Sequence, residues 1–405
     1  MNILFMSEVF FPHGSGAEYA TYLYAKLLKE EGVNVSVITN RFEGEAAFSE
    51  EGTLRIYRLS LFKNAGSLKY SVLKRLDVLA SSFLNNMLDW ADVVYFPRFW
   101  FPAIALAKAH RKPVIVHMHD YVSVCSLSSL FDEAEAAICP KTRRFCSPKC
   151  VYSFEKAHNR NLLGTLSSVL LNTTVGRYFP KLSKLADAII CVSTRQKELL
   201  IERERAFQNK TYVVYNPFPD YSNLEIKGKS FGYFGGPDPL KGFTVLYNAA
   251  SQINKRSPKS LDIQCTKFNT TNLKFTGEIS KLGFRLHKRL EIPDLENLYM
   301  QLKSVLVPSI WNEPWPYTIV EALVRRRFVV ASRIGGMPEQ VAGCKGVILV
   351  QPGDSKMLAD AIEHVMDLSM EEVVDLGSQN REAFLSRFNN YSSVRKFINL
   401  CEKLD

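Results

Sequence analysis

The sequence has no long apolar run, and we do not expect its first residues to be a targeting segment. It contains no stretch of 18 apolar residues, so we expect no membrane-spanning helix. The first residues lack a basic group, and Glu8 interrupts their apolar stretch, which makes them a poor signal peptide. The longest uncharged stretch, residues 161–176, is rich in Asn, Ser and Thr. We therefore expect a cytoplasmic protein.

Glycine and proline are too few for a collagen-like or low-complexity chain, at 21 and 18 of 405 residues. With 46% hydrophobic and 23% charged residues, the composition is that of a globular protein with two or three domains. The net charge is +10, and residues 1–217 hold 27 Lys or Arg against 20 Asp or Glu. This excess suits a membrane surface or a phosphorylated substrate, although a basic pI kept for solubility explains it equally well. No nucleic-acid motif occurs, so no nucleic-acid partner is expected.

Short apolar runs alternate with longer amphipathic segments along the whole chain. The runs expected to be strands are 3–6, 33–39, 92–96, 113–117, 188–192, 211–215, 231–234, 261–265, 273–276, 304–307, 328–332 and 346–350. They are rich in Val, Ile and Leu, as in a parallel sheet buried on both faces. The alternation predicts two α/β domains with doubly wound sheets, which break in the proline-containing stretch 217–230.

Two glycine turns follow the first expected strand of each half. Gly14 and Gly16 precede a helix at 17–31, whose free amides suit an anion or a substrate oxygen. Gly235 and Gly236 precede Lys241, a cation that a turn would place for a phosphate. In each case a purely structural turn, or a solvated lysine, is the simpler alternative.

The strongest signal is the stretch 311–323, WNEPWPYTIVEAL, after the expected strand 304–307. Pro316 suits the first position of a helix, where its missing N–H costs nothing. Glu321 lies in an otherwise apolar helix start and therefore needs a polar partner, such as a ribose hydroxyl. The amides at this helix start would face a diphosphate.

Taken together, the motifs resemble family 4 of the retaining nucleotide-sugar glycosyltransferases, which have the GT-B fold. The motifs, in order, are GSGAE at 14–18, VHMHD at 116–120, ADAIICVS at 186–193, VYNP at 214–217, the glycine turn and Lys241 at 235–242, Glu313-x7-Glu321, GGMPE at 335–339 and GD at 353–354. The ordered set covers nearly the whole chain.

The resemblance implies an architecture of two Rossmann-like domains whose parallel sheets face a cleft. Residues 1–217 would bind the acceptor and 218–387 the nucleotide sugar, while 388–405 would pack back on the first domain as a helix. It implies catalytic roles for His119, Glu313 and Lys241. It implies donor contacts from Gly16, Gly235, Gly236, Lys241, Trp315, Pro316, Tyr317, Thr318, Glu321 and Gly336. In such enzymes no metal or other cofactor is required, because fixed positive groups stabilise the leaving diphosphate.

One departure from the family pattern concerns the diphosphate. The family usually has Arg directly after the glycine of the second turn, where this chain has Gly236. Losing such a contact costs roughly 1.5–3 kcal/mol of charged hydrogen bonding. Arg285 and Lys288 are the candidates to replace it.

Histidines and cysteines are the remaining candidate ligands. His117 and His119 share one face of a strand, but no partner at a familiar spacing supports a metal there, so the resemblance favours a substrate role for His119. Within a Cys-rich insertion at about 121–151, four thiols are candidate ligands of a structural zinc ion. They are Cys125, Cys139, Cys146 and Cys150. Disulfides and free thiols are the alternatives.

The sequence and the resemblance together predict a glycosyltransferase that moves a hexose, with retention, from a UDP- or GDP-sugar to an acceptor hydroxyl. The basic first half points to a lipid-linked saccharide or a cell-surface glycan precursor at the cytoplasmic face of the membrane. The segment 59–88, which mixes lysines with Leu and Phe, is one candidate for membrane contact, with an ordinary packed helix as the alternative. A nucleotide-sugar epimerase and a non-catalytic nucleotide-sugar-binding protein are the alternative functions.

Overall fold

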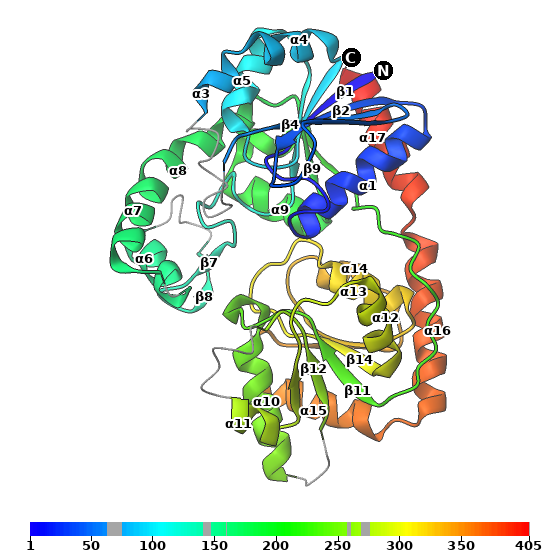
Figure 1. The fold of residues 1–405 in the computed structure, drawn as a ribbon. Coiled ribbons are helices and arrows are strands. Elements are labelled where there is room, and N and C mark those ends of the chain that lie inside the picture. The colour runs from blue at the N-terminus through cyan, green and yellow to red at the C-terminus, as the bar shows by residue number, and fades with distance from the viewer. Residues whose placement is uncertain (63–74, 141–146, 159, 257–260, 269–275, 405) are drawn as a thin grey trace. The chain divides into compact units, whose positions relative to one another are not determined.

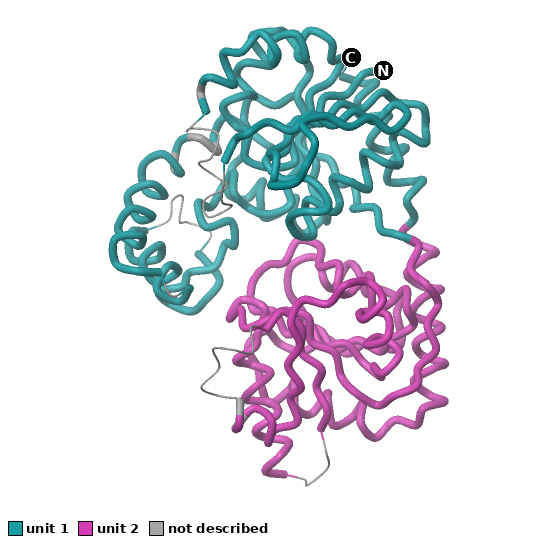
Figure 2. Tube along the Cα trace, viewed as in Figure 1, with its two compact units in different colours: residues 1–219, 389–405 teal, residues 220–388 magenta. Residues whose placement is uncertain are grey.

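The computed structural model describes residues 1–404 except 63–74, 141–146, 159, 257–260 and 269–275. The chain forms two compact units (Figure 2). Unit 1 comprises Met1–Pro219 and Asn389–Asp405, and unit 2 comprises Asp220–Phe388. The chain thus leaves unit 1 once, builds unit 2, and returns to unit 1 for its last helix.

Unit 1 is built around an eight-stranded sheet with the order β10-β9-β6-β5-β1-β2-β4-β3 (Figure 1). Its strands are β1 (Asn2–Met6), β2 (Asn34–Asn40), β3 (Phe48–Glu51), β4 (Leu54–Leu59), β5 (Val93–Phe96), β6 (Val114–Met118), β9 (Ala188–Cys191) and β10 (Thr211–Val213). All neighbours pair in parallel except β3, which runs antiparallel to β4 at the edge. The central strands β1, β5, β6 and β9 are almost entirely buried, as their continuous apolar sequences predict.

Helices cover both faces of this sheet. They are α1 (Gly16–Glu30), α3 (Leu76–Leu79), α4 (Ser82–Trp90), α5 (Phe101–Ala109), α9 (Thr194–Arg203) and α17 (Asn390–Leu404). In the described residues between β6 and β9 the chain adds a small hairpin and several helices: β7 (Phe131–Asp132), β8 (Ala137–Ile138), α6 (Pro148–Ala157), α7 (Leu162–Thr173), α8 (Val175–Tyr178) and the 3-10 helix η3 (Phe179–Leu185). Phe397 of α17 is fully buried against Phe5, Tyr24 and Tyr95, which anchors the last helix in the core of unit 1.

The strands β3 and β4 were not expected from the sequence. The residues of β4, LRIYRL, include two arginines, and only Leu54 is fully buried. Strand β3 at the edge and β4 beside it therefore lack the continuous apolar run that marks the inner strands. The segment 59–88 is also not one amphipathic helix, because Leu59 ends β4 and α4 begins only at Ser82. Residues 63–74, which include all three of its lysines, lie outside the described part of the chain.

Unit 2 holds a fully parallel six-stranded sheet with the order β13-β12-β11-β14-β15-β16. Its strands are β11 (Ser230–Tyr233), β12 (Ile263–Cys265), β13 (Phe284–Leu286), β14 (Leu302–Val307), β15 (Phe328–Ser332) and β16 (Val347–Val350). The helices are α10 (Phe243–Arg256), α11 (Thr276–Lys281), α12 (Ile292–Gln301), α13 (Tyr317–Val324), α14 (Met337–Val341), α15 (Ser355–Asp367) and α16 (Met370–Arg387). Both units are therefore Rossmann-like α/β domains, as predicted.

The strand predicted at 273–276 in unit 2 is wrong at Thr276, the one residue of that range that the structure describes. Thr276 opens helix α11 instead of ending a strand, and residues 273–275 lie outside the described chain. The strand that follows is β13, whose three residues include the charged Arg285. So short a run shows no apolar period in the sequence, which is why it was missed.

Within the described residues, every helix is too short or too polar to cross a membrane.

Candidate functional site

In unit 2, the motif residues gather at the carboxyl ends of four neighbouring strands. The glycine turn follows β11, Lys267 follows β12, Glu313 lies in the loop after β14, and Gly336 follows β15. Since β12, β11, β14 and β15 are adjacent in the sheet, these four loops lie side by side. Ligands of doubly wound sheets bind at this edge.

The glycine turn after β11 has no room for larger residues. A Cβ atom on Gly235 would lie 2.4 Å from the hydroxyl oxygen of Tyr233. Gly236 has φ +66°, and its Cβ would lie 3.3 Å from the carbonyl oxygen of Lys267. The turn then closes with Asp238, whose carboxylate accepts the N–H of Leu240 at 2.9 Å. Tyr233 therefore requires glycine at position 235, and the positive φ favours glycine at position 236. Gly235 is half-buried, Gly236 is buried and Pro237 is exposed.

Lys241 and Glu313, both predicted site residues, form an ion pair. Lys241 is the last residue of the short turn Pro239–Lys241, and its Nζ lies 2.9 Å from Oε2 of Glu313. The Glu313 side chain is 4% exposed, whereas that of Lys241 is 36% exposed. The Ser309 hydroxyl donates to the other carboxylate oxygen of Glu313. The ammonium therefore presents charge to solvent from a position fixed by a buried carboxylate.

Lys267 is a second cation at this edge that sequence reasoning missed. It has φ +68° directly after β12, and its carbonyl and Cβ pack against Gly236. Partial burial lowers the pKa of the Lys267 ammonium, and the charge of Lys241 lowers it further. The carboxylates of Glu321 and Glu313 act in the opposite direction, so all four groups lie within electrostatic reach. No motif marks Lys267, and only the folding of β12 beside β11 brings it to the glycine turn.

Arg285, predicted as a replacement for the missing family arginine, lies elsewhere. Its Nε pairs with Asp262 at 3.0 Å, and Asp262 also accepts the hydroxyl of Ser230 at 2.6 Å. Asp262 precedes β12 and Ser230 opens β11, so this cluster is at the amino ends of the strands, opposite Lys241. Lys288 is exposed beyond the carboxyl end of β13, and its neighbour Arg289 is close enough to help lower the pKa of Lys267.

The start of α13 presents backbone amides at the same edge. Pro316 is the N-cap, so the helix begins at Tyr317, one residue later than predicted. The Trp315 ring is buried against Phe388, with 5.1 Å between ring centroids, and leaves only its backbone for a ligand. Tyr317 and Thr318 are half-buried. Their N–H groups belong to the first turn of the helix, where no carbonyl oxygen of the helix itself is available as an acceptor.

Glu321, half-buried on α13, has protein partners for its carboxylate. Tyr221 and Tyr299 donate their hydroxyls to its two oxygens, at 3.2 and 3.0 Å. Tyr299 stacks on Phe234, and the Arg325 guanidinium lies over the rings of both tyrosines. A carboxylate has about four lone-pair positions, so two remain for further donors. The polar partner that the sequence demanded is therefore present within the chain itself.

Gly336 belongs to a turn that packs on the backbone of Glu313. Gly335 has φ +59°, and a Cβ there would lie 2.2 Å from the carbonyl oxygen of Glu313. The N–H of Gly336 donates to that same carbonyl at 2.8 Å. This contact fixes the loop that carries Glu313.

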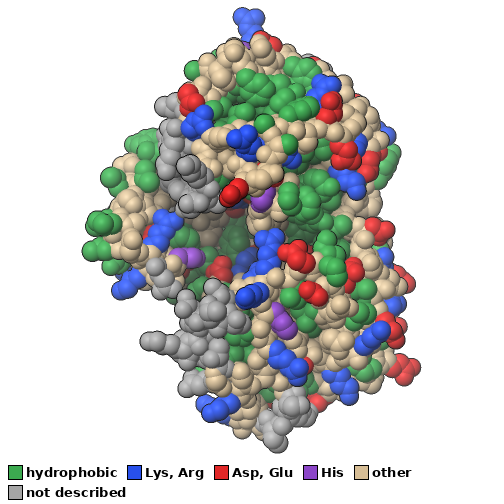
Figure 3. All heavy atoms as spheres, viewed as in Figure 1, with side chains coloured by type: hydrophobic (Ala, Val, Ile, Leu, Met, Phe, Trp, Pro, Cys, Tyr) green, Lys and Arg blue, Asp and Glu red, His purple; other side chains and the backbone are tan. Residues whose placement is uncertain are grey.

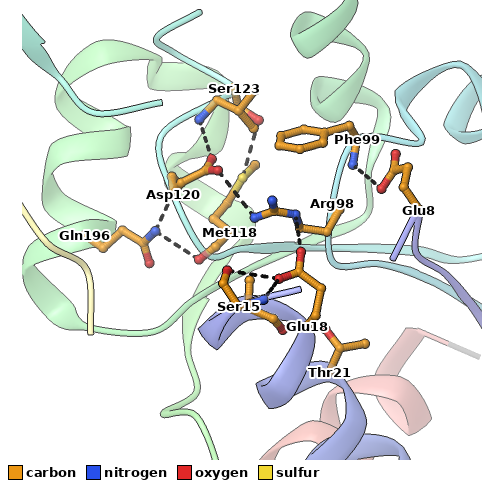
Figure 4. Close-up of polar contacts among 12 residues, drawn as sticks. Glu8, Ser15, Glu18, Thr21, Arg98, Phe99, Met118, Asp120, Ser123 and Gln196 are labelled. Atoms are coloured by element: carbon orange, nitrogen blue, oxygen red, sulfur yellow. Dashed lines mark hydrogen bonds and ion pairs between the residues drawn. The ribbon is translucent and has the colours of Figure 1, made fainter. Parts of the chain in front are cut away.

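In unit 1, a charged cluster lies where β1, β5 and β6 end (Figure 4). Arg98 follows β5, and its Nε lies 3.0 Å from Oε1 of Glu18, which is 1% exposed on α1. Asp120, after β6, lies 3.8 Å from the same guanidinium. Ser15 caps α1 and donates its N–H and hydroxyl to Glu18, at 2.8 and 3.1 Å. Burial opposes ionisation of Glu18, but Arg98 and these hydrogen bonds outweigh it and lower its pKa.

His119 lines a small cavity beside Arg98. Burial, and then the charge of Arg98, lower its pKa to about 3, so the imidazole is neutral at neutral pH. Its ring stacks on that of His117, with 4.2 Å between centroids, although His119 lies just beyond the end of β6 at Met118. The Nε2 of His119 is buried without a hydrogen-bond partner among the described residues. It is therefore a group that could contact a ligand.

Two further residues hold this edge of unit 1 in place. Gln196 donates its amide to the carbonyls of Met118 and Asp120, at 2.9 and 3.1 Å. Glu8 accepts the N–H of Phe99 at 3.1 Å, and burial raises its pKa to about 8. Gly16, predicted as a donor contact, is the exposed first residue of α1.

In the insertion between β6 and β9, Cys139 and Cys150 are free thiols. Cys125 and Cys150 are buried and Cys139 is half-buried, while Cys146 lies outside the described residues. Burial raises the pKa of Cys150 to about 12. Among the described residues, no three His, Cys, Asp or Glu side chains are grouped to hold a metal ion.

Comparison with known proteins places these sites in a family. The pattern of Glycosyltransferase Family 4 matches residues 14–220, and that of Glycosyl transferases group 1 matches residues 228–367. An uncharacterised glycosyltransferase of Methanocaldococcus jannaschii is 24% identical over 242 residues, which are 57% of this chain and 64% of that protein.

Two solved structures resemble the fold over the whole chain. Sucrose-phosphate synthase from Thermosynechococcus elongatus has a TM-score of 0.71 at 16% identity, covering 100% of this chain and 98% of that one. Anabaena HepE in complex with UDP-glucose has a TM-score of 0.64 at 18% identity, covering 100% of both chains. At these identities the likeness shows a GT-B fold alone. Because the first family pattern spans half of the sequence, the chain belongs to glycosyltransferase family 4.

Proposed function

We propose that the protein transfers a hexose, with retention of anomeric configuration, from a UDP- or GDP-sugar to an acceptor hydroxyl, without a metal ion. The observation that carries this proposal is the meeting of Lys241, Lys267 and Glu313 with the glycine turn and the start of α13 at one sheet edge. A cationic, amide-lined edge suits a diphosphate. The bound UDP-glucose of Anabaena HepE supports this donor class.

In the proposed arrangement Lys241 and Lys267 bind the diphosphate. An ammonium has three hydrogens, so Lys241 can donate to an oxygen of the diphosphate and still bind Glu313. Two fixed cations stabilise the charge that develops as the diphosphate leaves, which is the task a metal ion performs elsewhere. Lys267 would thus replace the family arginine as the second cation at the diphosphate, although it lies at a different position in the sequence.

The two glutamates would bind the sugars of the donor. Glu321 has lone pairs left beside its two tyrosine donors, and these suit the ribose hydroxyls. Glu313 would bind hydroxyls of the transferred hexose. Neutral His119 of unit 1 would accept a hydrogen bond from that hexose or donate one to it, without adding charge. The leaving phosphate would take the proton of the acceptor hydroxyl, as the family resemblance implies.

We further propose that the acceptor is a lipid-linked saccharide or a cell-surface glycan precursor at the cytoplasmic face of a membrane. Residues 1–217 carry 27 Lys or Arg against 20 Asp or Glu, which favours an anionic surface for this half of the chain.

A panel of UDP, GDP and ADP sugars in a thermal-shift assay tests the donor. A ligand at a hundredfold its Kd stabilises the folded protein by about 2.7 kcal/mol. The stabilising donor should lose its effect in Glu321→Ala and Lys241→Ala. No shift with any donor in the panel contradicts the proposed donor class.

Turnover of the selected donor then separates the candidate functions. Diphosphate release that depends on an acceptor, an unchanged anomeric configuration by NMR, and full activity in EDTA support the proposal. Interconversion of sugars without diphosphate release would instead show an epimerase. A thermal shift without turnover would show a binding protein.

A further inference from the structure

Helix α7 of unit 1 turns its apolar side outward. Leu162, Leu163, Leu166 and Leu170 are between 53% and 80% exposed. Leu162, Leu166 and Leu170 follow one another at intervals of four residues, so they form a single stripe along the helix. Figure 3 shows hydrophobic side chains at the left edge of the molecule, where Figure 1 places α7. An exposed apolar stripe of this kind marks a contact surface.

The polar side of α7 is the side that packs inward. Thr165, Ser168 and Asn172 are buried. The Ser168 hydroxyl donates to Glu155 of α6, a carboxylate that also pairs with Arg160 at 3.0 Å.

Hydrogen bonds hold this orientation of α7. The Asn172 amide donates to the Ser168 hydroxyl at 3.0 Å, and Ser126 donates to the Asn172 carbonyl at 3.2 Å. Rotating the helix to bury the leucines would break these buried hydrogen bonds and leave their polar groups without partners. The packing of α7 therefore keeps the leucines exposed.

The segment of the sequence that contains this helix, residues 121–186, has an excess of positive charge. It holds nine Lys or Arg against four Asp or Glu, a balance of +5 within a total of +10. Helix α7 has no charged residue. Among the described cations, Lys149 and Lys156 belong to α6, and Lys181 and Lys184 follow α8. So much like charge would oppose docking of a second copy through this region, whereas it attracts anionic lipid headgroups.

From the outward leucines and this charge, we propose that α7 is the element by which the protein binds an anionic membrane surface. The leucine stripe enters the boundary between headgroups and acyl chains, and the surrounding lysines and arginines lie among the phosphates. The proposal deepens the membrane contact included in the proposed function and moves it from segment 59–88 to α7. Binding to lipid needs neither donor nor acceptor, so it is measured independently of sugar transfer.

Vesicle flotation of the full chain tests this assignment. We expect flotation with phosphatidylcholine vesicles that contain about 30% phosphatidylglycerol, and much less with phosphatidylcholine alone. About 1 M salt, where the Debye length is about 3 Å, should also weaken binding. The variant Leu163→Gln/Leu166→Gln should lower the partition coefficient at least about tenfold.

The matched control is Ile292→Gln, which removes an apolar side chain that is 69% exposed on α12 of unit 2 and should leave flotation unchanged. Circular dichroism and thermal unfolding should match the wild type, and the single variant Leu163→Gln serves if the double variant unfolds. Three results would each overturn the proposal. They are no binding to anionic vesicles, equal binding by the folded leucine variants, and a dimer in light scattering that the leucine substitutions dissociate.

Discussion

Lys241 and Glu313 reach one another from two different loops, with 2.9 Å between Nζ and Oε2. The lysine comes from the turn after β11 and the glutamate from the loop after β14, two neighbouring strands. The two residues are 72 positions apart in the sequence, and the parallel pairing of β11 with β14 brings them together. The pair thus orients a cation that remains open to a ligand.

The first prediction concerns that cation. Lys241→Ala should weaken binding of the nucleotide-sugar donor by about tenfold to 150-fold, corresponding to about 1.5–3 kcal/mol for a charged hydrogen bond. Calorimetric titration of the donor measures this loss. Lys255→Ala, which removes an exposed lysine of α10, is the matched control and should bind normally. Equal affinity in wild type and Lys241→Ala would remove Lys241 from the donor site.

The second prediction concerns Lys267. Lys267→Ala should weaken donor binding and slow transfer by at least about tenfold, because one of the two cations proposed to bind the diphosphate is lost. Lys267→Arg should retain much of the activity, since it keeps the charge. Comparing a nucleoside diphosphate with the uncharged nucleoside separates the roles, because only the diphosphate should lose affinity. A loss that is the same for both ligands would point to a merely structural lysine.

The third prediction concerns the buried pair in unit 1. Arg98→Met leaves the Glu18 carboxylate 2% exposed and without its cation, which should cost about 3–5 kcal/mol of unfolding free energy. Glu18→Gln in the same chain should recover part of that loss. Urea denaturation followed by circular dichroism measures both. Arg55→Met, which breaks an exposed pair with Glu50, should leave the unfolding curve unchanged.

The fourth prediction is a pH dependence set by Glu8. Burial raises the pKa of Glu8 to about 8 in the folded protein from 4.5, while Arg98 lowers and Glu18 raises it to a smaller extent. Between these values the folded state binds a proton that the unfolded state has lost, so stability falls as the pH rises. Each pH unit in this window costs up to about 1.4 kcal/mol.

Glu8→Gln should abolish that slope, since the amide can still accept the N–H of Phe99. Thermal unfolding from pH 5 to pH 9 should therefore show the variant gaining on the wild type up to about pH 8 and then running parallel. Glu43→Gln, an exposed substitution, should follow the wild type throughout. Parallel curves for Glu8→Gln and wild type across the whole range would contradict a protonated Glu8.

Most strands could be predicted from the sequence, the edge strands β10 and β16 among them, whereas β3, β4 and β13 could not. Strands β1, β5, β6 and β9 are buried on both faces, so their apolar runs are continuous and unmistakable. Strand β4 lies next to the edge strand β3 and contains two arginines, and β13 is only three residues long. Neither carries a period that distinguishes it from a loop.

The candidate site likewise contains residues that could be predicted from the sequence and residues that could not. Lys241 and Glu313 lie within motifs, so their meeting could be anticipated. Lys267 lies in no motif, and Arg285 was chosen for its charge and position in the chain alone. Only the register of β12 between β11 and β13 shows that Lys267 faces the glycine turn while Arg285 pairs with Asp262. Strand pairing therefore decides which cation lies at the candidate site, and the spacing of residues in the sequence does not reveal it.

The close approach of Lys267 to Gly236 has a consequence for the order in which substitutions can accumulate. Gly236→Arg would restore the usual family residue, yet it would force a side chain into a left-handed φ of +66° and set its Cβ 3.3 Å from the Lys267 carbonyl. The single change should therefore destabilise unit 2 without adding a useful cation. A lineage that regained the arginine would first have to reshape the loop after β12. The lysine and the glycine thus constrain one another as an epistatic pair.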